Sequence, residues 1–131
     1  MSRDPAWLPR TAVIVIHELL IAEHGGATGP VDEAKLDAAL ARPKHRSAFE
    51  DADVFRLAAA YAFGIARDHP FRDGNKRVAL TVAGVFLELS GWRLEAPEAE
   101  AVAMTVALAA GEVDEAAYAT WLRSASSPTG E

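Results

Sequence analysis

The sequence contains no cysteine, which excludes disulfide bonds and thiolate zinc sites and permits a reducing compartment. It is also poor in positive charge, with 13 Lys and Arg against 19 Asp and Glu, a net charge of −6. A general nucleic-acid binder normally carries a basic face, so direct nucleic-acid binding is not expected. Long apolar runs are missing as well: the longest, 12–16 and the interrupted run 78–87, are too short to span a bilayer. Since the first residues also lack the apolar core of a signal peptide, we expect a cytoplasmic protein that does not bind membranes.

The chain does contain enough apolar residues to build one core. Half of its 131 residues are hydrophobic, an ordinary balance for a globular domain of this size. The sequence therefore predicts a single domain over residues 1–131. Irregular or disordered tails are expected at 1–9, which contains two prolines, and at the polar stretch 124–131.

Apolar residues recur at helical spacing through most of the chain, and strand-like alternation is not sustained. The pattern predicts an all-α fold of about six helices, over 10–23, 32–41, 53–68, 75–89, 97–110 and 114–123. Pro43 is expected to end the second helix, with a polar connection at 44–47. The stretch 78–89 is apolar nearly all round, which is typical of a central helix. The glycine-rich stretch 25–31 is expected to be a surface loop or a short β-hairpin, and 92–94 an extended link.

Polar chemistry is concentrated in residues 67–77, Arg-Asp-His-Pro-Phe-Arg-Asp-Gly-Asn-Lys-Arg, hereafter the motif loop. Its four cations outnumber its two carboxylates, so the motif loop is locally positive in an acidic protein. Pro70 disfavours the helical conformation at the residue before it, so a helix should end at or just before His69. Asn75 then opens the central helix.

Each side chain in this loop suits one part of a phosphate-transfer site. His69 is a general base of suitable pKa, about 6.5 when unperturbed, and Asp73 offers a hard carboxylate for Mg²⁺. Gly74 permits a tight turn and close approach of a ligand. The helix N-terminus that follows attracts anions, and Lys76 and Arg77 there are disfavoured unless an anion binds. The residues expected to hold nucleotide phosphates are Gly74, Asn75, Lys76 and Arg77.

Simpler interpretations exist for several of these residues. The same run is also a good turn between two helices, and a lone histidine is more often structural than catalytic. His17, in the first helix, could reach toward the site, but a structural role is favoured. Arg67 and Arg72 could contact a nucleotide or target, or form surface ion pairs. Which of these three takes part in the site stays open at this point.

The run from His69 to Arg77, His-Pro-Phe-Arg-Asp-Gly-Asn-Lys-Arg, resembles the signature of the Fic/Doc family. The typical Fic form is His-Pro-Phe-x-Asp/Glu-Gly-Asn-Gly-Arg, with another arginine three positions later. Lys76 stands here in place of the second glycine, and Leu80 in place of the last arginine. Both departures are features of Doc toxins, the toxic halves of bacterial toxin–antitoxin pairs. The resemblance extends over about residues 10–123.

The resemblance implies a Fic fold, with the glycine-rich loop as a flap over the site. It implies a kinase that uses ATP and Mg²⁺ to phosphorylate a threonine of elongation factor Tu, with His69 as base, Asp73 as metal ligand and residues 74–77 as phosphate cradle. An AMP transferase and a catalytically silent protein that only binds a partner are the alternatives. Because the inhibitory Ser/Thr-x-x-x-Glu-Gly/Asn segment of many Fic proteins is missing from the sequence, we expect control by a separate antitoxin.

Overall fold

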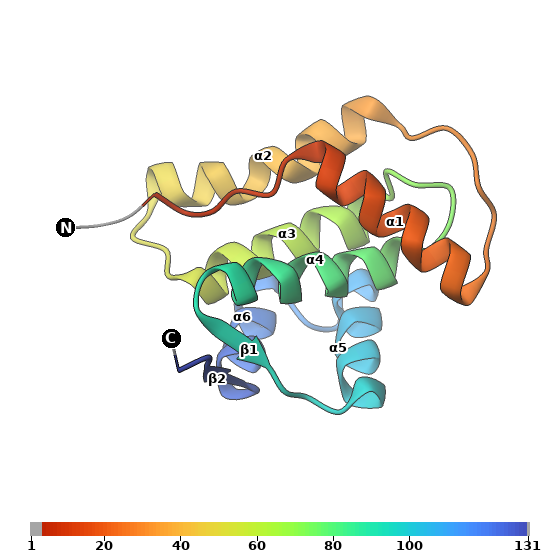
Figure 1. Cartoon of the computed structure of the whole chain (residues 1–131). Coiled ribbons are helices and arrows are strands. Elements are labelled where there is room, and N and C mark those ends of the chain that lie inside the picture. Colours follow the sequence, from red (N-terminus) through yellow and green to blue (C-terminus); the bar gives the residue numbers. More distant parts are fainter. Residues whose placement is uncertain (1–3, 131) are drawn as a thin grey trace.

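In the computed structural model, which describes residues 4–130, six helices and one small sheet form the fold (Figure 1). The helices are α1 (Arg10–His24), α2 (Glu33–Phe49), α3 (Val54–Asp68), α4 (Asn75–Leu89), α5 (Glu98–Ala110) and α6 (Glu115–Ser124). The strands are β1 (Trp92–Leu94) and β2 (Ser126–Pro128), paired antiparallel. The expected all-α architecture is confirmed. No helix in residues 4–130 combines the length and apolar character needed to cross a membrane.

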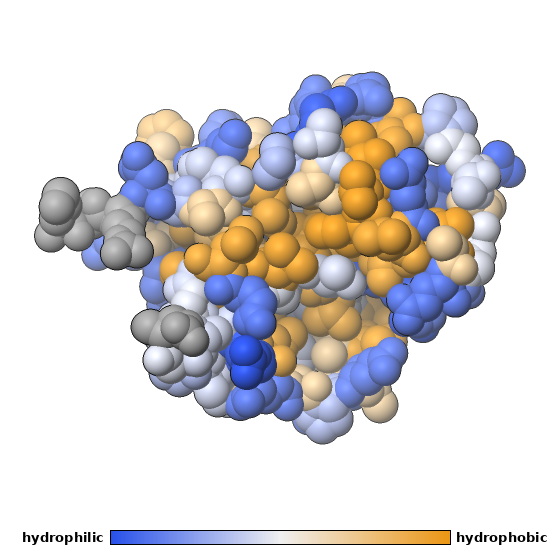
Figure 2. Space-filling model, viewed as in Figure 1, coloured by the Kyte–Doolittle hydropathy of each residue, from blue (hydrophilic) through white to orange (hydrophobic). Residues whose placement is uncertain are grey.

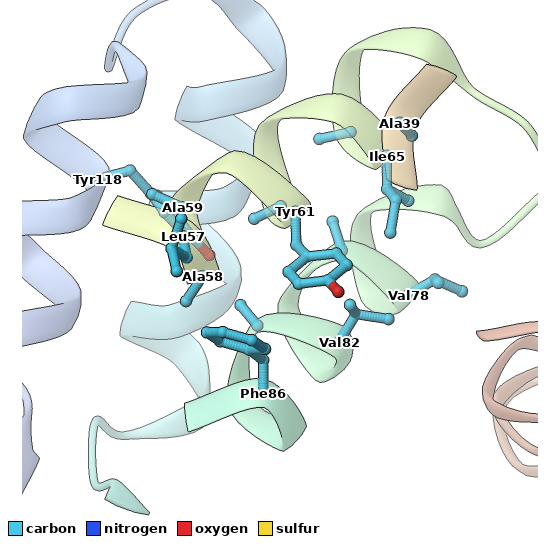
Figure 3. Packing of buried hydrophobic residues seen from close by; sticks show 14 of the residues in the cluster. Ala39, Leu57, Ala58, Ala59, Tyr61, Ile65, Val78, Val82, Phe86 and Tyr118 are labelled. Atoms are coloured by element: carbon cyan, nitrogen blue, oxygen red, sulfur yellow. The ribbon is translucent and has the colours of Figure 1, made fainter. Parts of the chain in front are cut away.

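The core is centred on the pair α3 and α4, which the motif loop joins. Helix α4 is central, as expected, and α3 is buried still more completely, with ten buried residues. Between the two helices the Tyr61 and Phe86 rings lie 5.2 Å apart, with Val82 and Val78 beside them (Figure 3). Around this pair, α2 and α6 pack on α3, α1 packs on α4, and α5 contacts both. Both ends of the motif loop are therefore fixed by the best-packed part of the molecule.

The prediction that Pro43 ends the second helix is wrong. Helix α2 continues through Pro43 to Phe49, so the expected polar connection at 44–47 is helical. Proline cannot donate a hydrogen bond to the carbonyl of Ala39, four residues earlier. That carbonyl lies where α2 meets Gly64 of α3: a Cβ built on Gly64 would be 3.2 Å from the Ala39 oxygen and 3.0 Å from its Cα. Tertiary packing of the buried Pro43 and this close approach outweigh the lost helical bond.

The expectation of a disordered C-terminal tail is wrong for the residues that form β2. Leu94 pairs with Ser126 and Trp92 with Pro128, and the Glu95 N–H donates to the Ala125 carbonyl at 2.8 Å. At the other end of the chain, residues 4–9 are irregular, as expected. Leu8 is nevertheless buried, and its N–H donates to the Tyr61 hydroxyl at 3.0 Å. Residues 1–3 and 131 lie outside the described chain.

The glycine-rich stretch 25–31 contains no strand, so of the two alternatives it is the loop. It joins α1 to α2 at the same end of the molecule as the motif loop (Figure 1). Just after it, the Asp32 N–H donates to the Pro70 carbonyl at 2.8 Å. The Asp32 side chain caps α2 by accepting from the Lys35 N–H. This bond and the cap fix one end of the glycine-rich loop to the motif loop.

Candidate active site

His69 ends α3 in an unusual backbone conformation. It is the C-cap residue with φ 55° and ψ 60°, the one described residue other than glycine with positive φ. Its N–H donates to the Ile65 carbonyl at 3.3 Å, and its side chain is exposed. Pro70 disfavours the right-handed helical region at His69 and so stops the helix there, and a left-handed residue is a common way for a helix to end. This conformation leaves the His69 side chain facing solvent at the end of the helix.

Buried contacts on both sides hold the middle of the motif loop. The Phe71 side chain is 4% exposed and stacks on the His17 ring of α1, with centroids 4.1 Å apart and planes 10° from parallel. The side-chain amide of Asn75 accepts from the Phe71 N–H at 3.0 Å and donates to the Phe71 carbonyl at 2.8 Å. Because Asn75 is itself buried, these two bonds fix the loop relative to the first turn of α4.

The N-terminus of α4 has the properties of an anion site. Gly74 is the N-cap with φ 79°, a value that favours glycine, and neither a capping side chain nor an acidic residue serves the first turn. Lys76 and Arg77 are both exposed in that turn. The free N–H groups and the helix dipole attract an anion, and the two side chains add positive charge. Arg77 lies 3.8 Å from Glu98 of α5, whereas Lys76 forms no ion pair with any residue from 4 to 130.

The Asp73 carboxylate is held by backbone groups of two different loops. Its Oδ2 accepts from the Ala27 N–H at 3.1 Å and its Oδ1 accepts from the Gly74 N–H at 2.9 Å. These two donors hold the pKa of the Asp73 carboxyl below its usual range, so the group is ionised at neutral pH.

No group of three or more potential metal-ligating side chains occurs within the described residues. One exposed carboxylate, that of Asp73, beside an anion site nevertheless fits Mg²⁺. This ion commonly takes one or two protein carboxylates and completes its shell with water and substrate phosphates.

The glycine-rich loop lies directly on the motif loop. A Cβ built on Gly26 would lie 3.0 Å from Asp73 Oδ2 and 2.8 Å from Ile21 Cδ1. One built on Gly29 would lie 3.0 Å from Arg72 Cδ. Glycine is therefore needed at 26, where φ is also 128°, whereas a side chain at 29 would have to displace the flexible Arg72 side chain. In this arrangement the backbone of the glycine-rich loop packs closely on side chains of the motif loop, which gives the expected flap a physical basis.

Hydrogen bonds connect Asp73 to Gly74 and Asn75 to Phe71 within the motif loop, whereas His69 is exposed at the end of α3 and its side chain forms no hydrogen bond or ion pair within residues 4–130. The Asn75 side chain is committed to Phe71, so its backbone N–H is the part that faces the anion site. His17, which the sequence left undecided, is buried and in contact with the motif loop: its Nε2 lies 3.0 Å from the Asp73 carbonyl oxygen. Arg67 lies over the Phe63 ring and Arg72 beneath Gly29. The signal for His17 was a polar residue on the buried face of an apolar helix.

Comparison with known proteins relates the whole arrangement to one family. The family model described as "Fic/DOC family" matches residues 7–87. The chain is 35% identical over 113 residues to the protein named "Protein kinase doc" of Escherichia phage P1, a match covering 85% of this chain and 88% of that one. It is 40% identical over 74 residues to "Toxin Doc" of Mycolicibacterium smegmatis, covering 55% of this chain and 57% of that one.

Proposed function

The chain belongs to the Fic/DOC family, and on that premise we propose that it is a Doc-type toxin acting as an ATP-dependent protein kinase. Its proposed target is a threonine of elongation factor Tu, so that its action arrests translation. The observation that carries the proposal is the motif loop, in which an exposed histidine ends one helix and an uncapped, cationic helix N-terminus opens the next only six residues later. The name of the phage relative, a protein kinase, supports the same chemistry.

His69 is proposed as the general base. Its exposed ring can accept the proton of a target hydroxyl while the hydroxyl oxygen forms a bond to the γ-phosphorus of ATP. The bond between that phosphorus and the β–γ bridging oxygen breaks, and ADP leaves. Phosphoryl transfer depends mainly on positioning and on neutralising charge. The left-handed conformation at the helix end serves the positioning, because it directs His69 away from the core.

The first turn of α4 is proposed to hold the phosphates. The backbone at Gly74 and Asn75 supplies N–H donors, and Lys76 and Arg77 supply charge. Asp73, ionised and exposed, would hold Mg²⁺, which when bound neutralises phosphate charge. Lys76 is the residue expected to decide how the triphosphate lies, because its long cationic side chain replaces the glycine of typical Fic proteins. This difference favours transfer of the γ-phosphoryl group over transfer of AMP.

Labelled ATP separates the proposed reaction from its alternatives. The purified protein and elongation factor Tu are incubated with ATP and Mg²⁺, with the label at the γ or the α phosphate. We expect label on the target threonine from the γ position only, and none with His69→Ala. Label only from the α position would indicate AMP transfer. Absence of any transfer, together with wild-type and His69→Ala proteins that are equally harmless on expression, would indicate a silent binding protein.

An antitoxin is the proposed regulatory partner, and one face of the molecule suits its binding. Hydrophobic side chains gather over α1 and α4 (Figure 2). On α1, Val15 is 50% and Leu19 64% exposed, one helical turn apart. Monomeric proteins rarely leave a broad apolar surface uncovered, and such surfaces usually mark a binding site. We assign this face, hereafter the α1–α4 face, to the antitoxin.

A further inference from the structure

His17 is a polar side chain in the middle of an apolar helix, and it is 6% exposed. Its neighbours Ile14, Ile16 and Ile21 are the kind of residue expected on a helix that packs against α4. Burial of an imidazole is unfavourable unless its nitrogens find partners. Because α1 has ordinary apolar residues available for packing, packing alone does not account for a histidine here.

Two contacts connect His17 to the motif loop. The ring stacks on Phe71 at 4.1 Å, and Nε2 lies 3.0 Å from the Asp73 carbonyl oxygen. A carbonyl oxygen can only accept a hydrogen bond, so His17 must carry a proton on Nε2 and donate it. The bond therefore fixes the peptide group between Asp73 and Gly74 from outside the loop.

That peptide group links the Asp73 carboxylate to the N-terminus of α4. Its N–H, on Gly74, donates to Asp73 Oδ1 at 2.9 Å and so orients the carboxylate. Gly74 is also the N-cap of α4, and its carbonyl accepts from the Val78 N–H at 3.0 Å. A rotation of the peptide would move the proposed metal ligand and the proposed phosphate site together.

We propose that His17 is a positioning residue for phosphoryl transfer: through its hydrogen bond to the Asp73 carbonyl it holds the carboxylate and the α4 N-terminus in register with the nucleotide phosphates. The catalytic part of this inference rests on the proposed kinase function. The effect of His17 on the conformation of the motif loop does not depend on that function. Misplacement of a reacting group by about 1 Å can cost about a hundredfold in rate. Loss of the bond should therefore reduce kcat by about ten- to a hundredfold.

Two substitutions separate the hydrogen bond from the packing. His17→Phe keeps a ring that can stack on Phe71 and removes the donor. His17→Gln loses the ring but keeps an N–H donor near the position of Nε2. The melting temperature, the Mg²⁺-dependent ATP affinity by calorimetry, and kcat and KM for ATP are measured for both and for the wild type. We expect His17→Phe to have the higher melting temperature of the two variants but the lower kcat and the weaker ATP affinity.

The proposal is overturned if the loss of kcat in the variants simply parallels their loss of thermal stability. If His17→Phe is as active as wild type, or if kcat falls in proportion to melting temperature in both variants, His17 is only a packing residue. The NMR signal of the Gly74 amide provides a test that needs no activity. It should shift, and its hydrogen exchange should accelerate, in His17→Phe but much less in His17→Gln. If the Gly74 amide responds in this way but the wild-type protein has no kinase activity, the kinase hypothesis is refuted and the positioning of the loop by His17 is retained. An unchanged Gly74 signal would refute the positioning itself.

Discussion

At the scale of single residues, the conformation of the motif loop depends on a series of contacts that begins at α1. His69, Asp73 and Gly74 all fall within the six residues, 69–74, that join α3 to α4. The orientation of Asn75 depends on Phe71, whose burial depends in turn on His17 of α1, 54 positions earlier in the chain than Phe71. Single-sequence patterns carry no information on such long-range contacts.

A second buried polar pair, outside the site, leads to a pH prediction. The Tyr118 hydroxyl lies 2.7 Å from Thr105 Oγ1, which itself donates to the Ala101 carbonyl, so the tyrosine must be the donor. Burial raises the pKa of Tyr118 to about 12. Because the folded state favours the protonated phenol, its stabilising effect is complete below the unfolded pKa of about 10 and is lost as pH rises towards 12.

We therefore expect the free energy of unfolding to fall as pH rises from about 10 to about 12, by at most about 3 kcal/mol from this group. Urea titrations across that range measure the slope. Tyr118→Phe should reduce this slope. Burial also raises the pKa of Tyr61, so a smaller pH dependence should remain in the variant. Equal slopes in wild type and variant would show that ionisation of Tyr118 does not lower the free energy of unfolding.

At the scale of elements, the presence of each helix could be predicted from the sequence. The ends of a helix could be predicted where a local feature, such as a capping residue, determines them. Asp32, Asp53 and Asp114 cap α2, α3 and α6 through their side chains, as acidic residues at such positions commonly do. The errors at Pro43 and at β2 share a cause. Both depend on packing or pairing with a segment distant in sequence, which overrides the local preference of the residues concerned.

The approach of α2 to α3 leads to a stability prediction. In Gly64→Ala the new methyl would lie 3.0 Å from Ala39 Cα and 3.1 Å from its Cβ, so the helices must separate. We expect a loss of about 1–3 kcal/mol in the free energy of unfolding, although alanine is the better helix former.

Gly84→Ala is the matched control, because a Cβ at Gly84 of α4 has no neighbour within 4 Å. It should be neutral or stabilising by up to about 1 kcal/mol. Equal effects on thermal unfolding would show that the helix crossing tolerates the methyl group.

At the scale of the whole molecule, the motif loop and the exposed apolar residues of the α1–α4 face are separate features on one scaffold. Hydrophobic periodicity correctly predicted a helical fold, but it could not locate the exposed apolar residues. Helical periodicity in α1 shows a broad apolar stripe, and the sequence does not say which half of the stripe is covered. In the structure, Val13 and His17 are buried while Val15 and Leu19 are exposed.

If the α1–α4 face binds the antitoxin, Leu19→Glu should weaken that complex. Burying a leucine side chain contributes about 1.5–3 kcal/mol, so the Kd should rise at least tenfold while the proposed kinase activity is unchanged. The control is Phe49→Glu, because Phe49 is 86% exposed but lies on α2. Calorimetry with the purified antitoxin measures both complexes. An unchanged Kd for Leu19→Glu, or an equal loss for Phe49→Glu, would place the antitoxin elsewhere.

The α1–α4 face also bears on the colloidal behaviour of the protein. Two copies, each with a net charge of −6, repel one another, but this repulsion reaches only about 8 Å at physiological ionic strength. The apolar side chains of α1 are not subject to that screening, and their attraction for a similar surface persists as salt rises. The chain alone therefore depends on electrostatic repulsion to stay dispersed. An antitoxin bound as proposed on the α1–α4 face would cover the apolar side chains themselves.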